Sequence, residues 1–450
     1  MTRSLKLCLI VLSFFVYFLI SPPFQAPDEP EHYQIIYFLT RLQYPRLVQD
    51  VRTSTNYQLL DTFEKVFNTT RVASENYVIP DFGAIKKFVS MKNTADGLPR
   101  IADPLSKQGH QPVLYHVLGA VFFSLSSLFH LDMVSQYYTV RALSTLFYFL
   151  SVFFAYHIFK YVFRKTAVAE NLTVFFALNP VTLKAGIAVN PDIALVFFSL
   201  FSLWVTFKIG KKISLKHVLL FTLLSGLAVW TKFQGVVLVP FFIFIFFRKD
   251  GLIKKSVIFS LLFLTAFLFV IFPWFLLNIM RYGAPIIDNF SIMGRFNLPH
   301  YSLLQSLVQA VFEFRHTVMH YAGFWGWGDP YPFKPFFLIY AVMFLFLSFM
   351  GAAVAILRKN ASNIALHVFL SSLLVFLFLV ALRHKLTRFS GDIQGRYLLP
   401  VFVVFVVYLA EGMAFFLRKK IETVSGYFFY FTLFQYFFVL CFVIIPKYYV

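Results

Sequence analysis

Acidic and basic side chains gather in a few short blocks of this 450-residue chain. The first block, PPFQAPDEPEHYQ, carries Asp28, Glu29 and His32 among four prolines. Because proline is tolerated in the first turn of a helix, the block predicts a helix that starts near Asp28. On that helix Asp28 lies four positions and Glu29 three positions before His32, so all three side chains can face one point. They could supply a general base or hold a metal. The alternative is that Asp28 caps the helix and Glu29 complements its dipole.

Further polar blocks lie where apolar segments begin or end. Each has an ordinary explanation by itself: tyrosine at a membrane interface, asparagine and proline in a turn, or lysine reaching the headgroups. Basic side chains near acids nevertheless suit a phosphate-bearing lipid substrate, because arginine matches phosphate bidentately and lysine adds a point charge. The residues in question are His110, Gln111 and Tyr115; Asn190 and Asp192; Lys232; Asn278 and Arg281; and Arg383, Lys385, Arg388 and Arg396.

The composition places the chain in a membrane. It is 59% hydrophobic and only 13% charged, whereas soluble domains carry roughly 25% charged residues. The apolar residues fall in blocks near the length that crosses a bilayer. A soluble enzyme, a disulfide scaffold and a disordered chain are therefore excluded, and an all-α integral membrane protein is predicted. The net charge of +20 lies mostly in short runs between apolar blocks, which indicates membrane topology and no nucleic-acid partner.

The apolar blocks and the basic runs together predict the topology. With segment 112–130 lying on or dipping into the outer face, every short inner loop is basic, as the positive-inside rule requires. Eleven spans follow, with the amino terminus inside. They are 5–21, 137–159, 171–187, 193–209, 217–231, 235–247, 256–280, 336–357, 362–382, 398–416 and 425–446. The first span is interpreted as an uncleaved helix rather than a signal peptide.

One polytopic domain, residues 1–450, accounts for this pattern. Two long extracytoplasmic loops interrupt it, at 22–136 and 283–335. The first is expected to carry juxtamembrane helices. No internal repeat was found.

Several blocks resemble, in the same order along nearly the whole chain, the signature blocks of a bacterial multipass membrane family. They are PPFQAPDEPEHY, HQPVLY, NPDIALVFF, FWGWGDPYP and GDIQGRYLLP. That family is related to the GT-C superfamily of glycosyltransferases, which use polyprenyl-phosphate-linked sugars. The resemblance implies a GT-C-like architecture, an extracytoplasmic active site, and a catalytic or metal-associated role for Asp28 and Glu29. His-Gln-Pro replaces the His-Pro-Pro of the superfamily, which leaves the role of Gln111 open.

The expected function is inverting transfer of a sugar from a polyprenyl-phosphate donor to an extracytoplasmic glycan, lipid or protein. Asp28 is the preferred base, with Glu29 beside it, and Lys232, Arg281 and Arg396 are expected to hold the lipid phosphate. Any divalent metal would be bound by Asp28, Glu29 and His32. The expected substrate-binding residues are His32, His110, Gln111, Tyr115, Asn190, Asp192, Gln394 and Tyr397.

Two other classes use the same residues. A transporter or flippase for a lipid-linked sugar would need the outer basic groups, but the missing repeat and the one-sided placement of unusual polar groups argue against it. A non-catalytic scaffold would tolerate replacement of Asp28, Glu29 and Arg396. The transferase requires Asp28 and Arg396 to meet in one exterior site.

Overall fold

Helices make up nearly all of the computed structural model. It describes residues 2–21, 23, 26, 28–43, 46–47, 105–106, 111–210, 213–250, 252–285, 301–312, 334–357, 361–386 and 394–446. His110, Arg388 and most of the two predicted long loops lie outside these residues, so their expected roles stay predictions.

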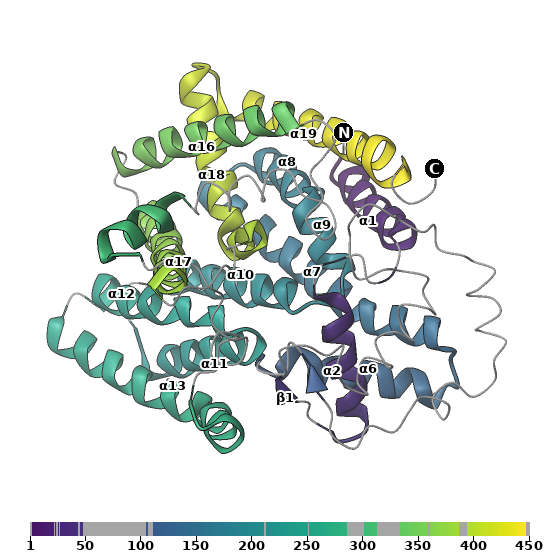
Figure 1. Cartoon of the computed structure of the whole chain (residues 1–450). Helices are drawn as coiled ribbons and strands as arrows, with labels where there is room; N and C mark the ends of the chain where they lie inside the picture. Colours follow the sequence, from purple (N-terminus) through teal and green to yellow (C-terminus); the bar gives the residue numbers. More distant parts are fainter. Residues whose placement is uncertain are drawn as a thin grey trace.

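The long helices follow the apolar blocks of the sequence (Figure 1). In chain order they are α1 (Arg3–Ile20), α2 (Glu29–Thr40), α6 (Leu114–Leu128), α7 (Met133–Phe163), α8 (Thr166–Ala177), α9 (Pro180–Ile187), α10 (Asp192–Lys208), α11 (Leu215–Thr231), α12 (Leu238–Asp250), α13 (Ile253–Tyr282), α16 (Lys334–Leu357), α17 (Ala361–Leu386), α18 (Phe402–Phe416) and α19 (Ile421–Val439).

Short elements complete the described part of the chain. The 3-10 helices η2 (Phe233–Val237) and η3 (Gly395–Val401) precede α12 and α18, and a π-turn, η4 (Leu440–Ile444), follows α19. A further apolar helix spans Leu303–Phe312. Two-residue strands β1 (Arg46–Leu47) and β2 (Leu105–Ser106) pair in parallel.

The all-α membrane architecture is confirmed, whereas the number of spans is not. Within the described ranges, six helices have the length and apolarity to cross a membrane, or seven if the bent pair α9–α10 counts as one span. Five apolar helices are shorter, among them α6, α8 and α11. Each predicted span contains a helix, but the count of eleven remains a prediction.

The predicted span 171–187 is broken at Asn179 and Pro180. The Asn179 side chain accepts from the Val181 backbone N–H at 3.1 Å, and Pro180 occupies the first turn of α9. Pro180 has no backbone N–H to continue the hydrogen bonds of α8 but fits the first turn of a new helix that Asn179 caps, so α8 stops and α9 begins there. Helices α9 and α10 then meet at 114°, which brings the connection at 188–191 toward α2.

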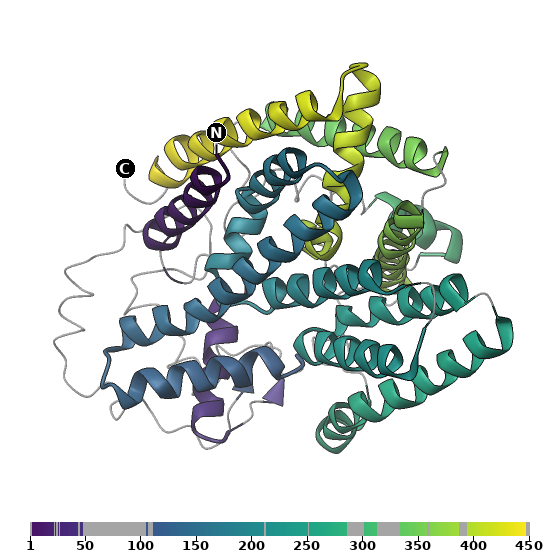
Figure 2. The same cartoon turned by 180° about the vertical axis from the view of Figure 1, so that it is seen from behind.

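Segment 112–130 forms the 15-residue helix α6. At 1.5 Å per residue it is about 22 Å long, shorter than a hydrocarbon core. It packs against α2 and α7, and Figures 1 and 2 show α2 beside it. The placement of α6 on or in the outer face of the membrane stays a prediction.

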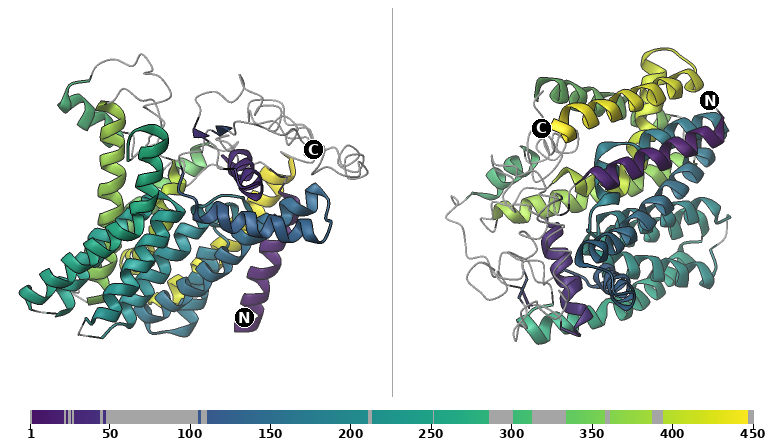
Figure 3. Two further views of the ribbon diagram at one scale, coloured as in Figure 1. Left: turned by 90° about the horizontal axis from the view of Figure 1, so that it is seen from below. Right: turned by 90° about the vertical axis from the view of Figure 1, so that its right-hand side faces the viewer.

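Contacts between helix ends define two ends of the helical body. At one end, Lys6 of α1 pairs with Glu170 of α8 at 3.0 Å, and Lys165 pairs with Glu422 of α19. This is the end that carries the predicted cytoplasmic basic residues. The starts of α2 and α10 and the end of α11 meet elsewhere, at the predicted outer end. Figure 3 shows the N-terminus at one extreme of α1, away from α2.

Close packing holds α16 across α18 (Figure 1). A Cβ on Gly351 would lie 1.8 Å from the carbonyl oxygen of Tyr408, and one on Gly412 would lie 1.9 Å from that of Leu347. Glycine lets the two backbones touch, as in other membrane helix pairs.

Candidate active site

Asp28 stands immediately before α2 but does not cap it. Its backbone is left-handed, with φ 63°, and its side chain makes no capping hydrogen bond. A non-glycine residue in this conformation is uncommon and strained. The carboxylate instead accepts from Nη2 of Arg396, with Oδ2 at 2.6 Å. The capping alternative is therefore not what the structure shows.

A second acid joins this pair. Asp192, the first residue of α10, lies with Oδ2 3.5 Å from Nε of Arg396, and its Oδ1 accepts from Nζ of Lys232. The four residues Asp28, Asp192, Lys232 and Arg396 are called the ionic cluster below. It contains two acids and two bases, so its formal charges cancel. The structure thus brings together residues from four separate segments, as the sequence predicted for Asp28 and Arg396.

Local backbone features position the cluster. The Asn190 side chain accepts from the backbone N–H of Asp192 at 2.9 Å, which fixes the start of α10. The N-terminus of α10 also favours an acid there. Lys232 follows the end of α11, and the chain then folds back as η2. Gly235 permits this turn, because a Cβ would lie 2.4 Å from the carbonyl carbon of Ala228.

Tyr397 lies against both cations. Its ring centroid is 4.5 Å from Nζ of Lys232 and 5.7 Å from Cζ of Arg396. Its backbone carbonyl accepts from Nε2 of Gln234 at 2.6 Å, which ties η3 to η2. Gln394 precedes η3, and its carbonyl accepts from the Tyr397 N–H at 3.0 Å. Cation–π contact of this kind stabilises and orients desolvated cations.

Glu29 is fully buried and faces a different set of groups. Its Oε2 accepts from the Ala26 N–H at 3.1 Å. Its Oε1 accepts from the Val189 N–H at 2.8 Å and from the Tyr137 hydroxyl at 2.5 Å. These donors satisfy a buried carboxylate. Glu29 therefore joins the start of α2 to α7 and to the α9–α10 connection, whereas Asp28 faces the ionic cluster.

A buried pair of histidines lies near the ionic cluster. Nδ1 of His32 is 2.9 Å from Nε2 of His116, whose Nδ1 is 3.3 Å from the carbonyl of Pro112. A carbonyl only accepts, so Nδ1 of His116 carries the proton and its Nε2 accepts from Nδ1 of His32. The lone pair of His32 is then on Nε2.

Both histidines lie outside the predicted spans and are held neutral. Burial, then the neighbouring His116, and also Arg396 and Lys232, lower the pKa of His32 well below its usual value, while Asp192 opposes this effect. Burial lowers the pKa of His116 to about 4, opposed by its bond to Pro112. At neutral pH the pair is therefore uncharged.

The predicted metal ligands do not converge. Asp28 faces Arg396, Glu29 faces backbone N–H groups and Tyr137, and His32 faces His116. Among the residues that the structure describes, no group of three His, Cys, Asp or Glu side chains could hold an ion.

The remaining predicted residues are distributed around this site. Tyr115 is buried, with its hydroxyl 2.7 Å from Oγ of Ser144, so it supports α6 against α7. Gln111 precedes α6. Arg281 lies in the last turn of α13, which packs against α11 and α12 and is not one of the four segments that form the ionic cluster.

The sequence pattern did not point to Arg141 or Tyr137 of α7. Arg141 is buried and donates from Nη1 to the carbonyls of Phe18 and Ser21, and from Nε to that of Ile187. It thereby joins the ends of α1 and α9 near the site. The available signal was an arginine inside the predicted apolar span 137–159, since ionisable residues at such positions are rare.

Residues 119–276 match the family model of dolichyl-phosphate-mannose-protein mannosyltransferases. The resemblance to GT-C glycosyltransferases is confirmed. The matched segment includes Asp192 and Lys232 of the ionic cluster; Asp28 and Arg396 lie outside it. No curated protein matches the chain.

Two solved structures are similar to the chain. One is ArnT from Cupriavidus metallidurans in the apo state, with 15% identity, a TM-score of 0.47, and coverage of 91% of this chain and 59% of that one. The other is the oligosaccharyltransferase of Archaeoglobus fulgidus in the apo form, with 13% identity, a TM-score of 0.47, and coverage of 98% and 55%. The chain thus spans somewhat more than half the length of either.

Proposed function

We propose that this protein transfers a sugar from a polyprenyl-phosphate donor to an acceptor hydroxyl on the extracytoplasmic side of the membrane. The acceptor class is a glycan, a lipid or a protein of the cell envelope. The observation that carries the proposal is the ionic cluster, in which a partly exposed carboxylate lies beside two cations suited to a lipid phosphate.

Asp28 is the base in this proposal. Its side chain is 27% exposed, against 7% for Asp192, so it is the cluster carboxylate that an acceptor can reach. It takes the acceptor proton as the hydroxyl oxygen bonds to the anomeric carbon. The bond from that carbon to the phosphate oxygen breaks, and polyprenyl phosphate leaves with the electron pair. Attack opposite the leaving group inverts the configuration.

Lys232 and Arg396 stabilise the departing phosphate. Both cations are paired with acids in this structure, so the donor phosphate competes with Asp28 for Arg396. Donor binding then weakens the Asp28–Arg396 pair and leaves the carboxylate free to accept the proton of the acceptor hydroxyl. In the proposed order of events, the donor binds first and Asp28 then takes the proton of the acceptor hydroxyl.

The neighbouring residues have separate roles. Glu29 is a positioning residue that holds the start of α2. Contacts with the sugar and the acceptor are assigned to His32, Asn190, Gln394 and Tyr397. No step is assigned to a metal, because the three predicted ligands do not fit one point. Arg281 remains a candidate for contacts to the donor from α13.

The test is sugar transfer by the purified protein in detergent. A panel of labelled polyprenyl-phosphate hexoses is supplied with extracted envelope lipids, glycans and proteins as acceptors, and release of polyprenyl phosphate is measured. We expect release with one donor class only when acceptor is present. A transporter needs two compartments and leaves the donor intact, so movement of unchanged donor across proteoliposomes without release in detergent would support the alternative.

A further inference from the structure

Basic and aromatic side chains meet at the predicted cytoplasmic end of the helical body. Cζ of Arg3, at the start of α1, lies 5.2 Å from the ring centroid of Tyr156 in α7. Nζ of Lys160, about one turn further along α7, lies 5.9 Å from the same ring. Nζ of Lys208, at the end of α10, lies 5.9 Å from the ring of Trp204. Three helices thus supply three cations, each held over an aromatic ring.

His157 lies between the two rings. Its ring centroid is 5.3 Å from that of Tyr156 and 6.4 Å from that of Trp204. All three cations are close enough to act on it electrostatically. The group is called the basic–aromatic cluster below, and its members are Arg3, Tyr156, His157, Lys160, Trp204 and Lys208.

The three cations of the cluster have no acidic partner in the described part of the chain. Other lysines at the same end do have partners. Lys6 pairs with Glu170, Lys165 pairs with Glu422, and Lys249 donates to two backbone carbonyls at the end of α10. Those lysines hold helices together, whereas the cluster concentrates positive charge. Charge of one sign gathered in one place favours an anionic partner.

Two hydrogen-bonding groups of the cluster point to the same kind of partner. The Tyr156 hydroxyl and Nε1 of Trp204 are covered and have no hydrogen-bond partner among the described residues. Covered polar groups normally have one. A ligand can reach them only when the side chains over the rings move, as interface side chains commonly do on binding. A ligand with several acceptor oxygens would satisfy both groups.

An exposed aromatic ring continues the cluster toward the middle of the predicted membrane. Phe153 precedes His157 by one turn of α7, with 4.5 Å between the ring centroids, and is 52% exposed. The three cations lie at the ends of the predicted spans 5–21, 137–159 and 193–209, which is the level of lipid headgroups. Positive charge at headgroup level with an apolar ring deeper in the bilayer matches a phospholipid.

We propose that the basic–aromatic cluster binds an anionic phospholipid of the phosphatidylglycerol class from the cytoplasmic leaflet. Juxtamembrane basic residues attract anionic lipids in general, and here the two rings hold three of them around one place. The phosphate lies among Arg3, Lys160 and Lys208, because arginine matches two of its oxygens and lysine adds a point charge. An acyl chain packs on Phe153. A zwitterionic lipid also brings an ammonium, which the three cations repel. The proposal does not rest on the proposed sugar transfer.

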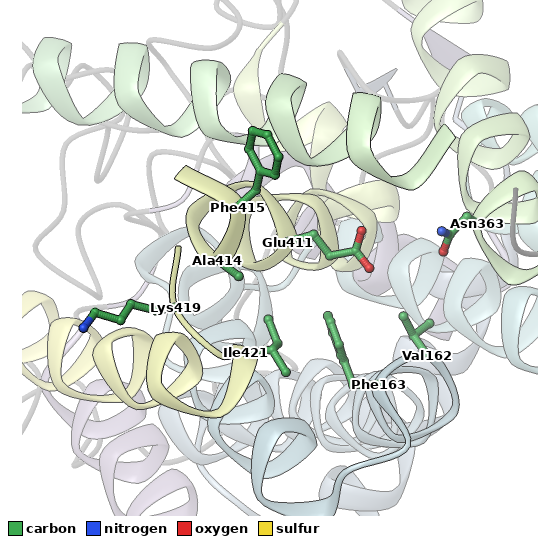
Figure 4. Close-up of a pocket in the computed structure, with 8 residues that line it drawn as sticks. All are labelled: Val162, Phe163, Asn363, Glu411, Ala414, Phe415, Lys419 and Ile421. Carbon is green, nitrogen blue, oxygen red and sulfur yellow. The ribbon is translucent and has the colours of Figure 1, made fainter. Parts of the chain in front are cut away.

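A cavity of about 460 Å³ at the same predicted end is a separate feature (Figure 4). It lies among α7, α17, α18 and α19, and Lys419 is one of its lining residues. Its lining includes Val162 and Phe163 from the end of α7 but no member of the basic–aromatic cluster. Lys419 can therefore tell a lipid in this cavity from a lipid at the cluster.

Native mass spectrometry of the purified, delipidated protein tests the headgroup preference. Dioleoyl lipids with glycerol, ethanolamine or choline headgroups are titrated separately, and soluble glycerol 3-phosphate separates a lipid from a free phosphate. We expect the glycerol lipid to bind at least about fivefold more tightly than either zwitterionic lipid, and glycerol 3-phosphate not to bind. Equal binding of the three lipids, or binding of glycerol 3-phosphate as tight as that of the lipid, would overturn the proposal.

The double variant Arg3→Gln with Lys208→Gln then locates the site. Both side chains are exposed, so the fold should survive, and a thermal unfolding curve checks this. The matched control is Lys254→Gln with Lys419→Gln, which removes the same charge from two exposed lysines at the same end and outside the cluster. The preference for the glycerol lipid should disappear in the first variant and persist in the control. Equal loss in both variants would indicate diffuse attraction, and loss in the control alone would place the lipid elsewhere; either result contradicts the proposal.

Discussion

Asp28 and Arg396 are 368 positions apart in the chain, and Nη2 of Arg396 lies 2.6 Å from Oδ2 of Asp28. The left-handed backbone at Asp28 leaves its carboxylate uninvolved in capping α2. Among the five non-glycine residues with positive φ in the described part of the chain, Asp28 is the member of the ionic cluster. Strain of this kind tends to occur at functional sites, which is consistent with a chemical role for Asp28.

Asp28→Asn should abolish sugar transfer and leave the fold intact. A general base contributes about 10²–10⁴-fold to rate, so a fall of at least about 100-fold is expected. The measurement is initial rate in detergent beside a thermal unfolding curve. The control is Asp132→Asn, because Asp132 accepts from the Ser135 N–H at 3.0 Å and caps α7. Unchanged transfer by Asp28→Asn would remove it as the base.

Arg396→Lys should weaken donor binding more than it slows turnover. One ammonium cannot reproduce the guanidinium that meets both Asp28 and Asp192 and matches a phosphate. We expect the KM for the polyprenyl-phosphate donor to rise about tenfold or more, with a smaller change in kcat. Arg248→Lys, an exposed arginine in the last turn of α12 and outside the candidate site, is the control. An unchanged KM would argue against a phosphate site at Arg396.

Glu29→Gln should lower the stability of the fold, and any loss of sugar transfer should follow from that loss of stability. Its carboxylate accepts from two backbone N–H groups and from Tyr137, and an amide places its own N–H₂ where one acceptor is needed. An unsatisfied buried group costs about 1–3 kcal/mol. Tyr137→Phe removes one donor and should cost about 1 kcal/mol. Loss of transfer by Glu29→Gln with unchanged thermal unfolding would instead indicate a direct part in the chemistry.

The histidine pair predicts a decline of stability in acid. The pKa of His116 is about 4 in the folded protein and about 6.5 when unfolded. Between these values the unfolded chain binds a proton that the folded chain does not, so stability falls as pH falls from about 6.5 to about 4. His116→Gln should reduce that slope. His217→Gln, at the start of α11, should leave it unchanged; equal slopes in all three proteins would contradict the prediction.

Arg141→Met should destabilise the protein strongly. It removes the donors to the carbonyls of Phe18, Ser21 and Ile187 and leaves those helix ends unsatisfied in the interior. A hydrogen bond from a charged group contributes about 1.5–3 kcal/mol, and a buried acceptor left without a donor costs about 1–3 kcal/mol, so a loss of several kcal/mol is expected. Thermal unfolding in detergent measures the effect. Lys160→Met, an exposed substitution on the same helix, is the control; similar losses for both variants would show that the carbonyl contacts of Arg141 are unimportant.

The sequence by itself determined where the helices lie. Apolar length and proline position act locally, so the blocks near α1, α7, α13 and α19 predict helices within a few residues of those observed. The break at Asn179 and Pro180 is also set by local residues, but the apolar run continues across it, so apolar length alone predicts one span there. The residue types of the ionic cluster were also visible, since charged groups at the ends of apolar segments are unusual.

Only the tertiary structure decided which of these groups meet. Asp28 and Glu29 are adjacent carboxylates, but they have different partners. The backbone conformation at Asp28 directs its carboxylate to Arg396, whereas the packing of α7 and α9 buries Glu29 against Tyr137. Partners far apart along the chain are chosen by how helices pack, and packing depends on shape contacts that no local pattern encodes. For the same reason, only the packed structure shows the His32–His116 pair and the hydrogen bonds from Arg141 to the carbonyls at the end of α1.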